Sequence, residues 1–294
     1  MKPLFIVNPR SGGGRSGRAL EALLDVARSS LGEIDASFTE RPRHATELAR
    51  EAAEAGREVV VAVGGDGSIH EVANGLLQAR ERGATKTSLG IIGQGTGGDF
   101  RKALGLEHRL DRYLAAIAGG VARPIDVGRF AYTTHDGREA ESYFINILSV
   151  GMGGLVDTYV AQTTKAFGGT VAYFAASARA MVDSQLARLA ITARAPSVEG
   201  PGLDKKPGET RELEVDSRML AICNGQFFGS GMHVAPMADA FDGQFEVVSL
   251  GDAPKLKFAL TSSRIYSGKH IGAPEVIHFP CDRIQIDLEN ENAE

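Results

Sequence analysis

Apolar residues come in short uninterrupted runs along the first 124 residues, and each run is followed by a stretch with helical periodicity. The runs predict strands near residues 3–7, 58–63 and 88–92, and a further strand is expected near 34–39. The stretches that follow predict helices near residues 16–31, 44–55, 68–80 and 110–118. Runs that are apolar at every position are typical of strands buried on both faces of a parallel sheet. The alternation therefore predicts an α/β domain with a doubly wound, mostly parallel sheet.

The pattern changes after Pro124, where shorter apolar segments are separated by glycine and proline turns. These segments predict strands over residues 142–148, 186–193, 219–224 and 244–250. One helical stretch at 171–182 is expected to pack on the strands rather than to line a lipid passage, and residues 196–211 to form an exposed loop or a mobile hairpin tip. We expect residues 1–124 to form the first domain. Residues 125–294 would form a second, antiparallel β-rich domain, whose last segment could return to the first.

Composition and charge narrow the functional classes. A hydrophobic content of 43% with 23% charged residues is ordinary for a soluble globular protein. The net charge of −5 argues against broad nucleic-acid binding and against purely electrostatic adhesion to an anionic membrane. Cys223 and Cys281 have a spacing unsuited to a metal site, which favours a reducing compartment. The sequence shows no secretory signal and no apolar run near the ~20 residues that span a bilayer, so we expect a cytoplasmic protein.

The most informative segment is a glycine-rich turn, Gly64-Gly-Asp-Gly-Ser68, that directly follows a buried strand. Its three glycines let the backbone turn sharply and approach a ligand. Ser68 and Glu71 match a capping box, which predicts a helix whose first amides point back into the turn and form an anion site. Asp66 would repel a bare phosphate, so we expect it to face a divalent metal or a hydroxyl donor. The alternative is an ordinary tight strand–helix connection.

Two further glycine-rich turns, at residues 8–14 and 93–100, also lie between a predicted strand and a predicted helix. The three turns would gather at the carboxyl edge of one sheet, where ligands bind in open α/β folds. Backbone amides of residues 11–14, 65–68 and 95–98 would then bind a triphosphate, and Asp66 and Asp99 would bind Mg²⁺. Nearby arginines either attract phosphate or form a solvated basic face: Arg10, Arg15, Arg18, Arg41 and Arg43.

These turns resemble the three signatures of the diacylglycerol kinase catalytic family, which includes bacterial lipid kinases, sphingosine kinases and ceramide kinases. The matching segments are Asn8-Pro9 with Ser11-Gly12, Gly64–Gly67 running into Glu71–Gly75, and Gly95-Thr96 with Asp99-Phe100. The likeness continues through the second half of the chain. There it involves Ile125–Gly128, Asn224-Gly225, Gly229, Gly231, Pro236, Asp242-Gly243 and Gly268–His270.

The resemblance implies an ATP-dependent kinase that transfers the γ-phosphoryl group to a lipid hydroxyl, with diacylglycerol first among the candidate acceptors. It implies ATP and Mg²⁺ as cofactors, a role in phospholipid biosynthesis and an active site in the cleft between the two domains. The residues expected to bind the nucleotide or to form its loops are Asn8, Pro9, Arg10, Ser11, Gly12, Thr39, Gly64, Gly65, Asp66, Gly67, Ser68, Glu71, Gly95, Thr96 and Asp99.

The resemblance also assigns two aspartates of the second domain. Asp242 matches the family's general base, although Asp-Gly is also a strong turn dipeptide and Asp242 could be a turn residue. Asp183 is a candidate ligand for the family's structural magnesium. Contact with the membrane is expected to be peripheral and transient, nucleic acid is not expected as a partner, and a homodimer is left open.

The chain departs from the family pattern at Gly93, where proline is usual, and at Gly98, where asparagine is usual. Because Asp99 is kept, we interpret these changes as tuning and not as loss of activity. Family members also continue past a segment like residues 283–287 into further strands, whereas this chain ends at Glu294.

Two other functions stay open. One is a kinase of a soluble acceptor such as NAD, against which Asn74-Gly75 and Asp242 argue. The other is a nucleotide-sensing regulatory protein without turnover, against which the retention of Asp66, Asp99 and Asp242 argues.

Overall fold

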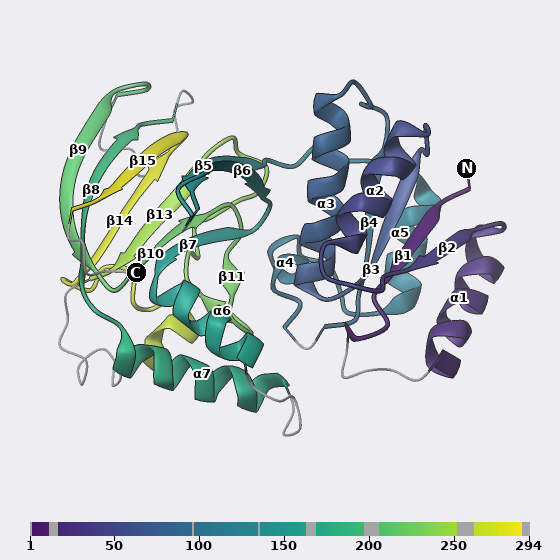
Figure 1. The fold of residues 1–294 in the computed structure, drawn as a ribbon, viewed down its shortest axis with the longest axis horizontal. Helices are drawn as coiled ribbons and strands as arrows, with labels where there is room; N and C mark the ends of the chain where they lie inside the picture. The colour runs from purple at the N-terminus through teal and green to yellow at the C-terminus, as the bar shows by residue number, and fades with distance from the viewer. Residues whose placement is uncertain are drawn as a thin grey trace. The chain divides into compact units, whose positions relative to one another are not determined.

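The computed structural model describes residues 2–11, 17–95, 97–134, 136–162, 169–196, 206–251 and 262–289. The chain divides into two compact units, Met1–Ile145 and Asn146–Glu294 (Figure 1). The domain boundary expected after residue 124 stays a prediction.

The first unit is built on a four-stranded parallel sheet in the order β2-β1-β3-β4. Its strands are β1 (Leu4–Val7), β2 (Asp35–Phe38), β3 (Val59–Gly64) and β4 (Ser88–Gly93). Its helices are α1 (Gly17–Leu31), α2 (His44–Glu54), α3 (Asp66–Glu81), α4 (Asp99–Ala103) and α5 (Leu110–Gly119). Every element predicted for this half is present, and the short helix α4 is additional.

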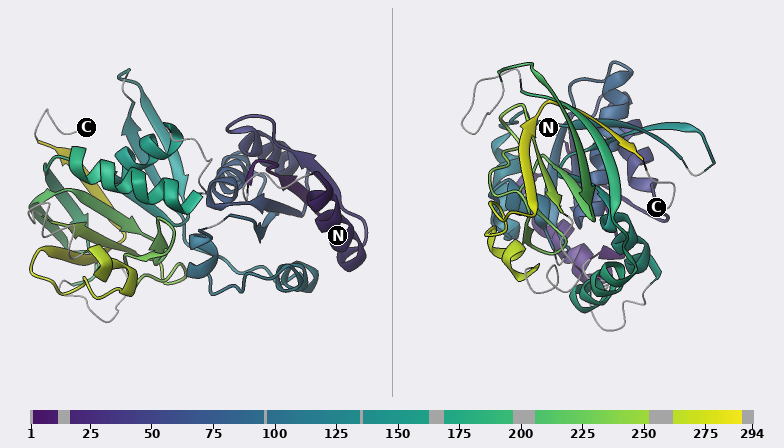
Figure 2. Two further views of the ribbon diagram at one scale, coloured as in Figure 1. Left: turned by 90° about the horizontal axis from the view of Figure 1, so that it is seen from below. Right: turned by 90° about the vertical axis from the view of Figure 1, so that its left-hand side faces the viewer.

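Helices cover both faces of this sheet. Strand residues such as Phe5 and Val61 pack with the leucines of α1 and α5, whereas their neighbours Ile6 and Val60 pack with α2 and α3. Successive strand residues point to opposite faces, so a continuously apolar strand fits a sheet covered on both sides. Figures 1 and 2 show the two helical layers, and the doubly wound fold is confirmed.

The helices α2 and α3 approach each other unusually closely. A Cβ atom on Gly75 would lie 2.2 Å from the carbonyl oxygen of Thr46 and 2.8 Å from the Cβ atom of Ala49. The buried positions of α2 are all alanine, and this explains why the helix has few large apolar residues. Small side chains on α2 and a glycine on α3 therefore set the spacing of this helical layer.

A two-stranded antiparallel hairpin, β5 (Gly128–Thr133) and β6 (Glu139–Phe144), completes the first unit. The side chain of Asn74 binds it to α3. Asn74 Nδ2 donates to the carbonyl oxygen of Tyr143, and Asn74 Oδ1 accepts from the Tyr143 amide, both at 3.1 Å. Asn74 Oδ1 also accepts from Ser142 Oγ at 3.1 Å. The buried side-chain amide of Asn74 thus makes the two hydrogen bonds to Tyr143 of β6 that the backbone of a neighbouring strand would make.

The second unit contains two larger antiparallel sheets with the orders β14-β13-β10-β7 and β15-β8-β9, and β11 pairs with β12 in a two-stranded one. The strands of the first sheet are β7 (Ile147–Gly151), β10 (Met219–Cys223), β13 (Phe245–Leu250) and β14 (Val276–Cys281). Those of the second are β8 (Ala187–Arg194), β9 (Thr210–Ser217) and β15 (Arg283–Leu288). The remaining elements are α6 (Met152–Gln162), α7 (Gly169–Asp183), β11 (Phe227–Phe228), β12 (Met232–His233) and the 3₁₀ helix η3 (Ser262–Ser267).

This unit confirms the antiparallel β-rich prediction and corrects several details. The strand expected over 142–148 is interrupted at Ile145 and Asn146, so that its two halves belong to β6 and β7. Several elements of this unit, among them α6, β9, β14 and β15, were not predicted from the sequence. Because β8 and β9 pair as a hairpin, residues 195–209 join two neighbouring strands, although 197–205 lie outside the described residues. The strands β14 and β15 pair with β13 and β8 of this unit, and the expected return of the last segment to the first domain stays a prediction.

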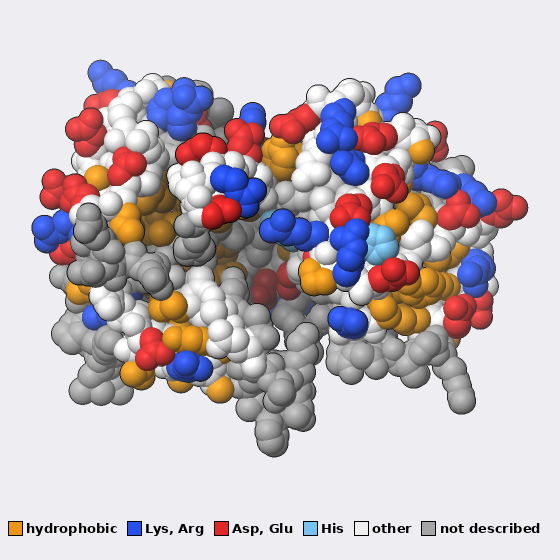
Figure 3. All heavy atoms as spheres, viewed as in Figure 1, with side chains coloured by type: hydrophobic (Ala, Val, Ile, Leu, Met, Phe, Trp, Pro, Cys, Tyr) orange, Lys and Arg blue, Asp and Glu red, His pale blue; other side chains and the backbone are white. Residues whose placement is uncertain are grey.

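The helices α6 and α7 lie together at one end of the second unit (Figure 1). Val156 of α6 packs with Ala176 and Ala180 of α7. Met181 of α7 packs against the core that includes β10 and β13, as expected for a helix that packs on the strands. Within the described ranges, no helix is both long enough and apolar enough to cross a membrane. On the face drawn in Figure 3, acidic and basic side chains are interspersed over both units, as the small net charge leads one to expect.

Candidate functional site

The three glycine turns begin at the carboxyl ends of β1, β3 and β4, which are neighbours in the first sheet. Backbone hydrogen bonds connect the turns directly. The Asn8 amide donates to Val63 O at 3.0 Å, and the Gln94 amide donates to Gly64 O at 2.7 Å. The Thr39 amide donates to Val7 O at 2.9 Å, so the end of β2 joins the same edge. The turns and Thr39 therefore gather where the sequence analysis expected them.

Asn8 organises the first turn. Its Oδ1 atom accepts from the Arg10 amide at 3.0 Å, and its carbonyl oxygen accepts from Ser11 Oγ at 2.8 Å. Its Nδ2 atom donates to Ser68 Oγ at 2.9 Å and connects the first turn to the start of α3. Gly12 lies outside the described residues. The contacts of Asn8 hold two phosphate-binding candidates, Ser11 and Ser68, near each other.

The second and third turns touch through their glycines. A Cβ atom on Gly95 would lie 2.8 Å from the Cα atom of Gly65, and one on Gly64 would lie 2.4 Å from Ser68 Oγ. A Cβ atom on Gly67, in contrast, would meet nothing within 4 Å. Glycine is therefore required at Gly64 and Gly95 for packing, while Gly67 leaves the outer side of the turn open. Thr96 lies outside the described residues.

The structure corrects the predicted capping box. Helix α3 begins at Asp66, and Ser68 lies inside its first turn, where the Ser68 amide donates to Gly65 O at 2.9 Å. Glu71 does not reach back to the start of α3. Its Oε1 atom accepts from the Arg43 amide at 3.1 Å, at a residue in the left-handed conformation (φ 64°) just before α2. Glu71 thus stabilises the connection that follows Thr39, and its contact with a nucleotide stays a prediction.

Asp66 has partners that the sequence analysis did not foresee. Its Oδ2 atom accepts from the Asp99 amide and its Oδ1 atom from the Phe100 amide, each at 3.1 Å. These two amides stabilise the carboxylate in the turn, and its contact with a metal or a hydroxyl donor stays a prediction. The Asp66 carboxylate still faces the third turn.

The two predicted metal ligands converge on one point beside Gly97. A Cβ atom on Gly97 would lie 3.4 Å from Asp66 Oδ2 and 3.5 Å from Asp99 Oδ2. Among the residues that the structure describes, no group of three or more His, Cys, Asp or Glu side chains could enclose a metal ion. Two carboxylates completed by phosphate oxygens are the usual protein environment of Mg²⁺, so these residues fit the predicted ion.

Both departures from the family pattern have a structural explanation. Gly98 has φ 58°, the left-handed conformation that glycine and asparagine adopt most readily, so glycine preserves the backbone that asparagine would form. At Gly93, a Cβ atom would lie 3.0 Å from the phenolic oxygen of Tyr113. The buried Tyr113 ring of α5 thus occupies the space behind the third turn that a side chain at Gly93 would need. Burial of this phenol raises the pKa of Tyr113, which keeps it neutral.

The second unit contains the two remaining candidates. Asp242 forms a turn: its Oδ1 atom accepts from the Gln244 amide at 3.1 Å, and its Oδ2 atom accepts from Gln244 Nε2 at 2.8 Å. Asp183 accepts from the Tyr159 hydroxyl at 2.6 Å and lies 3.5 Å from Arg179 Nε. Asp183 therefore links α6 to α7, and it belongs to no metal-binding group among the described residues. Its role as a magnesium ligand stays a prediction, as does the catalytic role of Asp242.

The sequence analysis missed two residues of the first unit that contact the site. Tyr113 is a single aromatic residue on a helical face and gave no signal apart from its apolar periodicity. Lys102 lies one helical turn after Asp99, and its Nζ atom is 3.1 Å from Asp99 Oδ1. The sequence signal for this contact is the spacing: Lys102 follows Asp99 by three positions, and residues at this spacing are neighbours on a helix.

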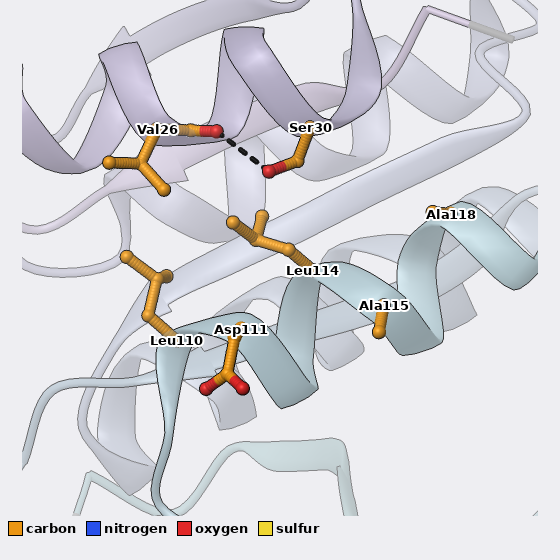
Figure 4. Close-up of a pocket in the computed structure, with 7 residues that line it drawn as sticks. All are labelled: Val26, Ser30, Leu110, Asp111, Leu114, Ala115 and Ala118. Atoms are coloured by element: carbon orange, nitrogen blue, oxygen red, sulfur yellow. Dashed lines mark hydrogen bonds between the residues drawn. The ribbon is translucent and has the colours of Figure 1, made fainter.

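An apolar groove lies elsewhere in the first unit, between α1 and α5 (Figure 4). It has a volume of about 490 Å³. Val26, Leu110 and Leu114 point toward one another across it, and Ser30 Oγ donates to the carbonyl oxygen of Val26. It includes none of the predicted site residues, so it is separate from the glycine turns.

Comparison with known families agrees with this geometry. Residues 2–130 match the model of the diacylglycerol kinase catalytic domain, and residues 146–293 match that of the YegS C-terminal NAD kinase beta sandwich-like domain. The chain belongs to the diacylglycerol kinase family. Its glycine turns all lie within the first match, and Asp242 lies within the second. Membership of this family makes the chain an ATP-dependent lipid kinase.

Individual relatives span most of the chain. It is 29% identical over 289 residues to a diacylglycerol kinase of Bacillus subtilis (strain 168), covering 97% of this chain and 85% of the relative. It is 28% identical over 244 residues to a probable lipid kinase YegS-like protein of Citrobacter koseri. That match covers 83% of this chain and 72% of the relative. A solved putative diacylglycerol kinase from Bacillus anthracis superimposes with a TM-score of 0.71 at 22% identity. That superposition covers 98% of this chain and 87% of the other, and it shows the shared fold.

Proposed function

We propose that this kinase transfers the γ-phosphoryl group of ATP to the hydroxyl of a diacylglycerol-like lipid. The observation that carries the proposal is the convergence of Asp66 Oδ2 and Asp99 Oδ2 beside Gly97, within the segment that matches the diacylglycerol kinase catalytic domain. Phosphoryl transfer needs a neutralised triphosphate, an acceptor hydroxyl placed in line and a base for its proton.

The first unit would supply the nucleotide site. Backbone amides of the glycine turns would bind the phosphates, with Asn8 and Ser11 holding the first turn in place. Asp66 and Asp99 would hold Mg²⁺, which neutralises phosphate charge when it is bound. In the second unit, Asp242 would accept the proton of the lipid hydroxyl. The hydroxyl oxygen then bonds to the γ-phosphorus while the bond to the β–γ bridging oxygen breaks and ADP leaves.

The names of the relatives favour a lipid acceptor over a soluble one, since they include a diacylglycerol kinase and probable lipid kinases. A lipid hydroxyl reaches the enzyme only if its chains stay in the bilayer or are sheltered from water. We therefore propose that the enzyme binds membranes peripherally. Flotation with lipid vesicles should recover it at low salt and release it on washing; retention through high salt and alkaline washes would contradict peripheral binding.

The decisive experiment is transfer of labelled γ-phosphate from ATP, assayed across a panel of acceptors. We expect the label in an organic-soluble product with diacylglycerol in mixed micelles and none in the presence of excess chelator. Label in a water-soluble product with NAD would instead support the soluble-acceptor kinase. Nucleotide binding without transfer to any acceptor would support the regulatory alternative.

A further inference from the structure

Lys102 and Asp99 form an ion pair at the third glycine turn. Lys102 Nζ lies 3.1 Å from Asp99 Oδ1, and both residues belong to α4. The Asp99 side chain is only 7% exposed, whereas that of Lys102 is 32% exposed. Lys102 is therefore the more exposed member of the pair. A buried carboxylate needs such a partner, because an uncompensated buried charge is strongly destabilising.

The two oxygens of Asp99 face different neighbours. Oδ1 contacts Lys102, whereas Oδ2 is turned toward Gly97 and the carboxylate of Asp66. The Oδ2 side, beside Gly97, is where the predicted metal ion fits, whereas the ammonium contacts Oδ1. A lysine and a divalent ion can thus contact Asp99 at the same time, on opposite oxygens.

Charge complementarity indicates what the ammonium binds. Two carboxylates lie close together here, and the cations beside them are the Lys102 ammonium and the Arg101 guanidinium, which lies against Gly98. A metal–nucleotide complex adds a cation between the carboxylates and several anionic oxygens beside them. Lysine has three donors on a flexible stem, so its ammonium can keep Asp99 as one acceptor and bind a phosphate oxygen with another donor.

We propose that the Lys102 ammonium binds a phosphate oxygen at this site and that Asp99 positions it. The proposal rests on the proposed function, since it requires a nucleotide at the glycine turns. It assigns Asp99 two tasks: holding Mg²⁺ through Oδ2 and holding the lysine through Oδ1. Lys102 is then a residue that touches the substrate, on the same short helix that Asp66 anchors by its first amides.

The test is calorimetric binding of ADP and of adenosine to the full chain in the presence of Mg²⁺. Lys102→Met keeps the apolar stem and removes the charge. It should weaken ADP binding about 10- to 100-fold, the range for a lost hydrogen bond to a charged group, and leave adenosine binding unchanged. Lys102→Arg should retain most of the ADP affinity. Lys86→Met is the matched control, because Lys86 is an exposed lysine before β4, at the opposite edge of the sheet.

Several outcomes would overturn the proposal. Unchanged ADP affinity in Lys102→Met would show that the ammonium contacts no phosphate. Equal losses for ADP and adenosine would show that the lysine only supports α4. If the methionine variant unfolds, Lys102→Gln retains a donor for Asp99 and is measured in its place. A wild-type protein that binds neither ADP nor ATP would refute the proposed function itself, whereas ADP binding that ignores Lys102 refutes only this inference.

Discussion

Asp66 in the second glycine turn accepts a hydrogen bond from the backbone amide of Asp99 in the third, at 3.1 Å. The same carboxylate accepts from the Phe100 amide, so it fixes the start of α4. One side chain therefore joins two loops and also contributes negative charge to the place where a metal fits. The structural role and the proposed chemical role share the Oδ2 atom.

Substituting Asp66 should separate these roles. Asp66→Ala removes the acceptor of two amides and should cost about 1–3 kcal/mol of unfolding free energy, besides abolishing turnover. Asp66→Ser can still accept an amide hydrogen bond and should recover part of the stability without recovering activity. Chemical unfolding and single-turnover phosphate transfer measure the two effects. Wild-type turnover in Asp66→Ser would mean that Asp66 only holds α4.

The contact between α2 and α3 gives a second prediction. Gly75→Ala places a methyl group 2.2 Å from a backbone oxygen that cannot rotate away, so the helices must separate. We expect a loss of about 3 kcal/mol, at the upper end for overpacking. Gly119→Ala is the control, because a Cβ atom there meets nothing within 4 Å and alanine favours the helix by up to about 1 kcal/mol. Thermal unfolding of both variants checks the difference, and equal melting temperatures would contradict it.

The sequence predicted the first unit well because each element there is specified locally. Continuous apolar runs gave the strands, the glycine turns gave their carboxyl ends, and helical periodicity gave the covering helices. The second unit was harder to predict, because its pairings join distant segments such as β8 with β15. Short strands such as β11 and β12 have only two residues each, too few for any periodicity.

At the site, the sequence predicted which loops meet but not what their side chains contact. Ser68 and Glu71 have the spacing of a capping box, yet Glu71 bonds to Arg43, 28 residues earlier in the chain. Asn74 looks like an ordinary helix residue, yet its amide pairs with Tyr143, 69 residues later. Such contacts depend on tertiary packing, and local sequence patterns do not contain that information.

His270 should make the second unit sensitive to acid. Its Nε2 atom lies 2.8 Å from Val234 O and donates to it, while Nδ1 is buried without a hydrogen-bond partner among the described residues. Burial lowers the pKa of His270 below its ordinary value of 6.5. A histidine with a lowered pKa is protonated more readily in the unfolded chain. The stability it contributes is therefore complete above pH 6.5 and decreases as the pH falls below that value.

The comparison of wild type with His270→Gln tests this dependence. Glutamine can donate to Val234 O through its amide but does not titrate. Unfolding free energies measured between about pH 7.5 and pH 5.5 should therefore fall less steeply for the variant than for wild type. If the unfolding free energy falls equally steeply with pH in both proteins, another group causes the acid sensitivity.

Asp242 is the candidate base, and Asp239 provides its matched control. Both are aspartates of the same turn region: Asp239 Oδ1 accepts from the Phe241 amide at 3.1 Å, much as Asp242 Oδ1 accepts from the Gln244 amide. In Asp242→Asn, the remaining oxygen can still accept from the Gln244 amide, and the Gln244 side chain can rotate to pair with the new NH₂ group. The turn should therefore survive the substitution, and so should the conformation of Gly243 at φ 79°.

The two roles of Asp242 predict different kinetics for this one substitution. An asparagine cannot take the proton of the lipid hydroxyl, and general-base catalysis contributes roughly 10²- to 10⁴-fold in rate. We expect Asp242→Asn to lower the single-turnover rate by about that factor, with unchanged ATP affinity, and Asp239→Asn to leave the rate near wild type. If Asp242 is only a turn residue, both variants should transfer phosphate as fast as wild type, because asparagine suits such turns as well as aspartate does. Both aspartates form turns, but only Asp242 is the candidate base. A rate loss in Asp242→Asn and not in Asp239→Asn would therefore show that Asp242 acts in catalysis as well as in turn formation.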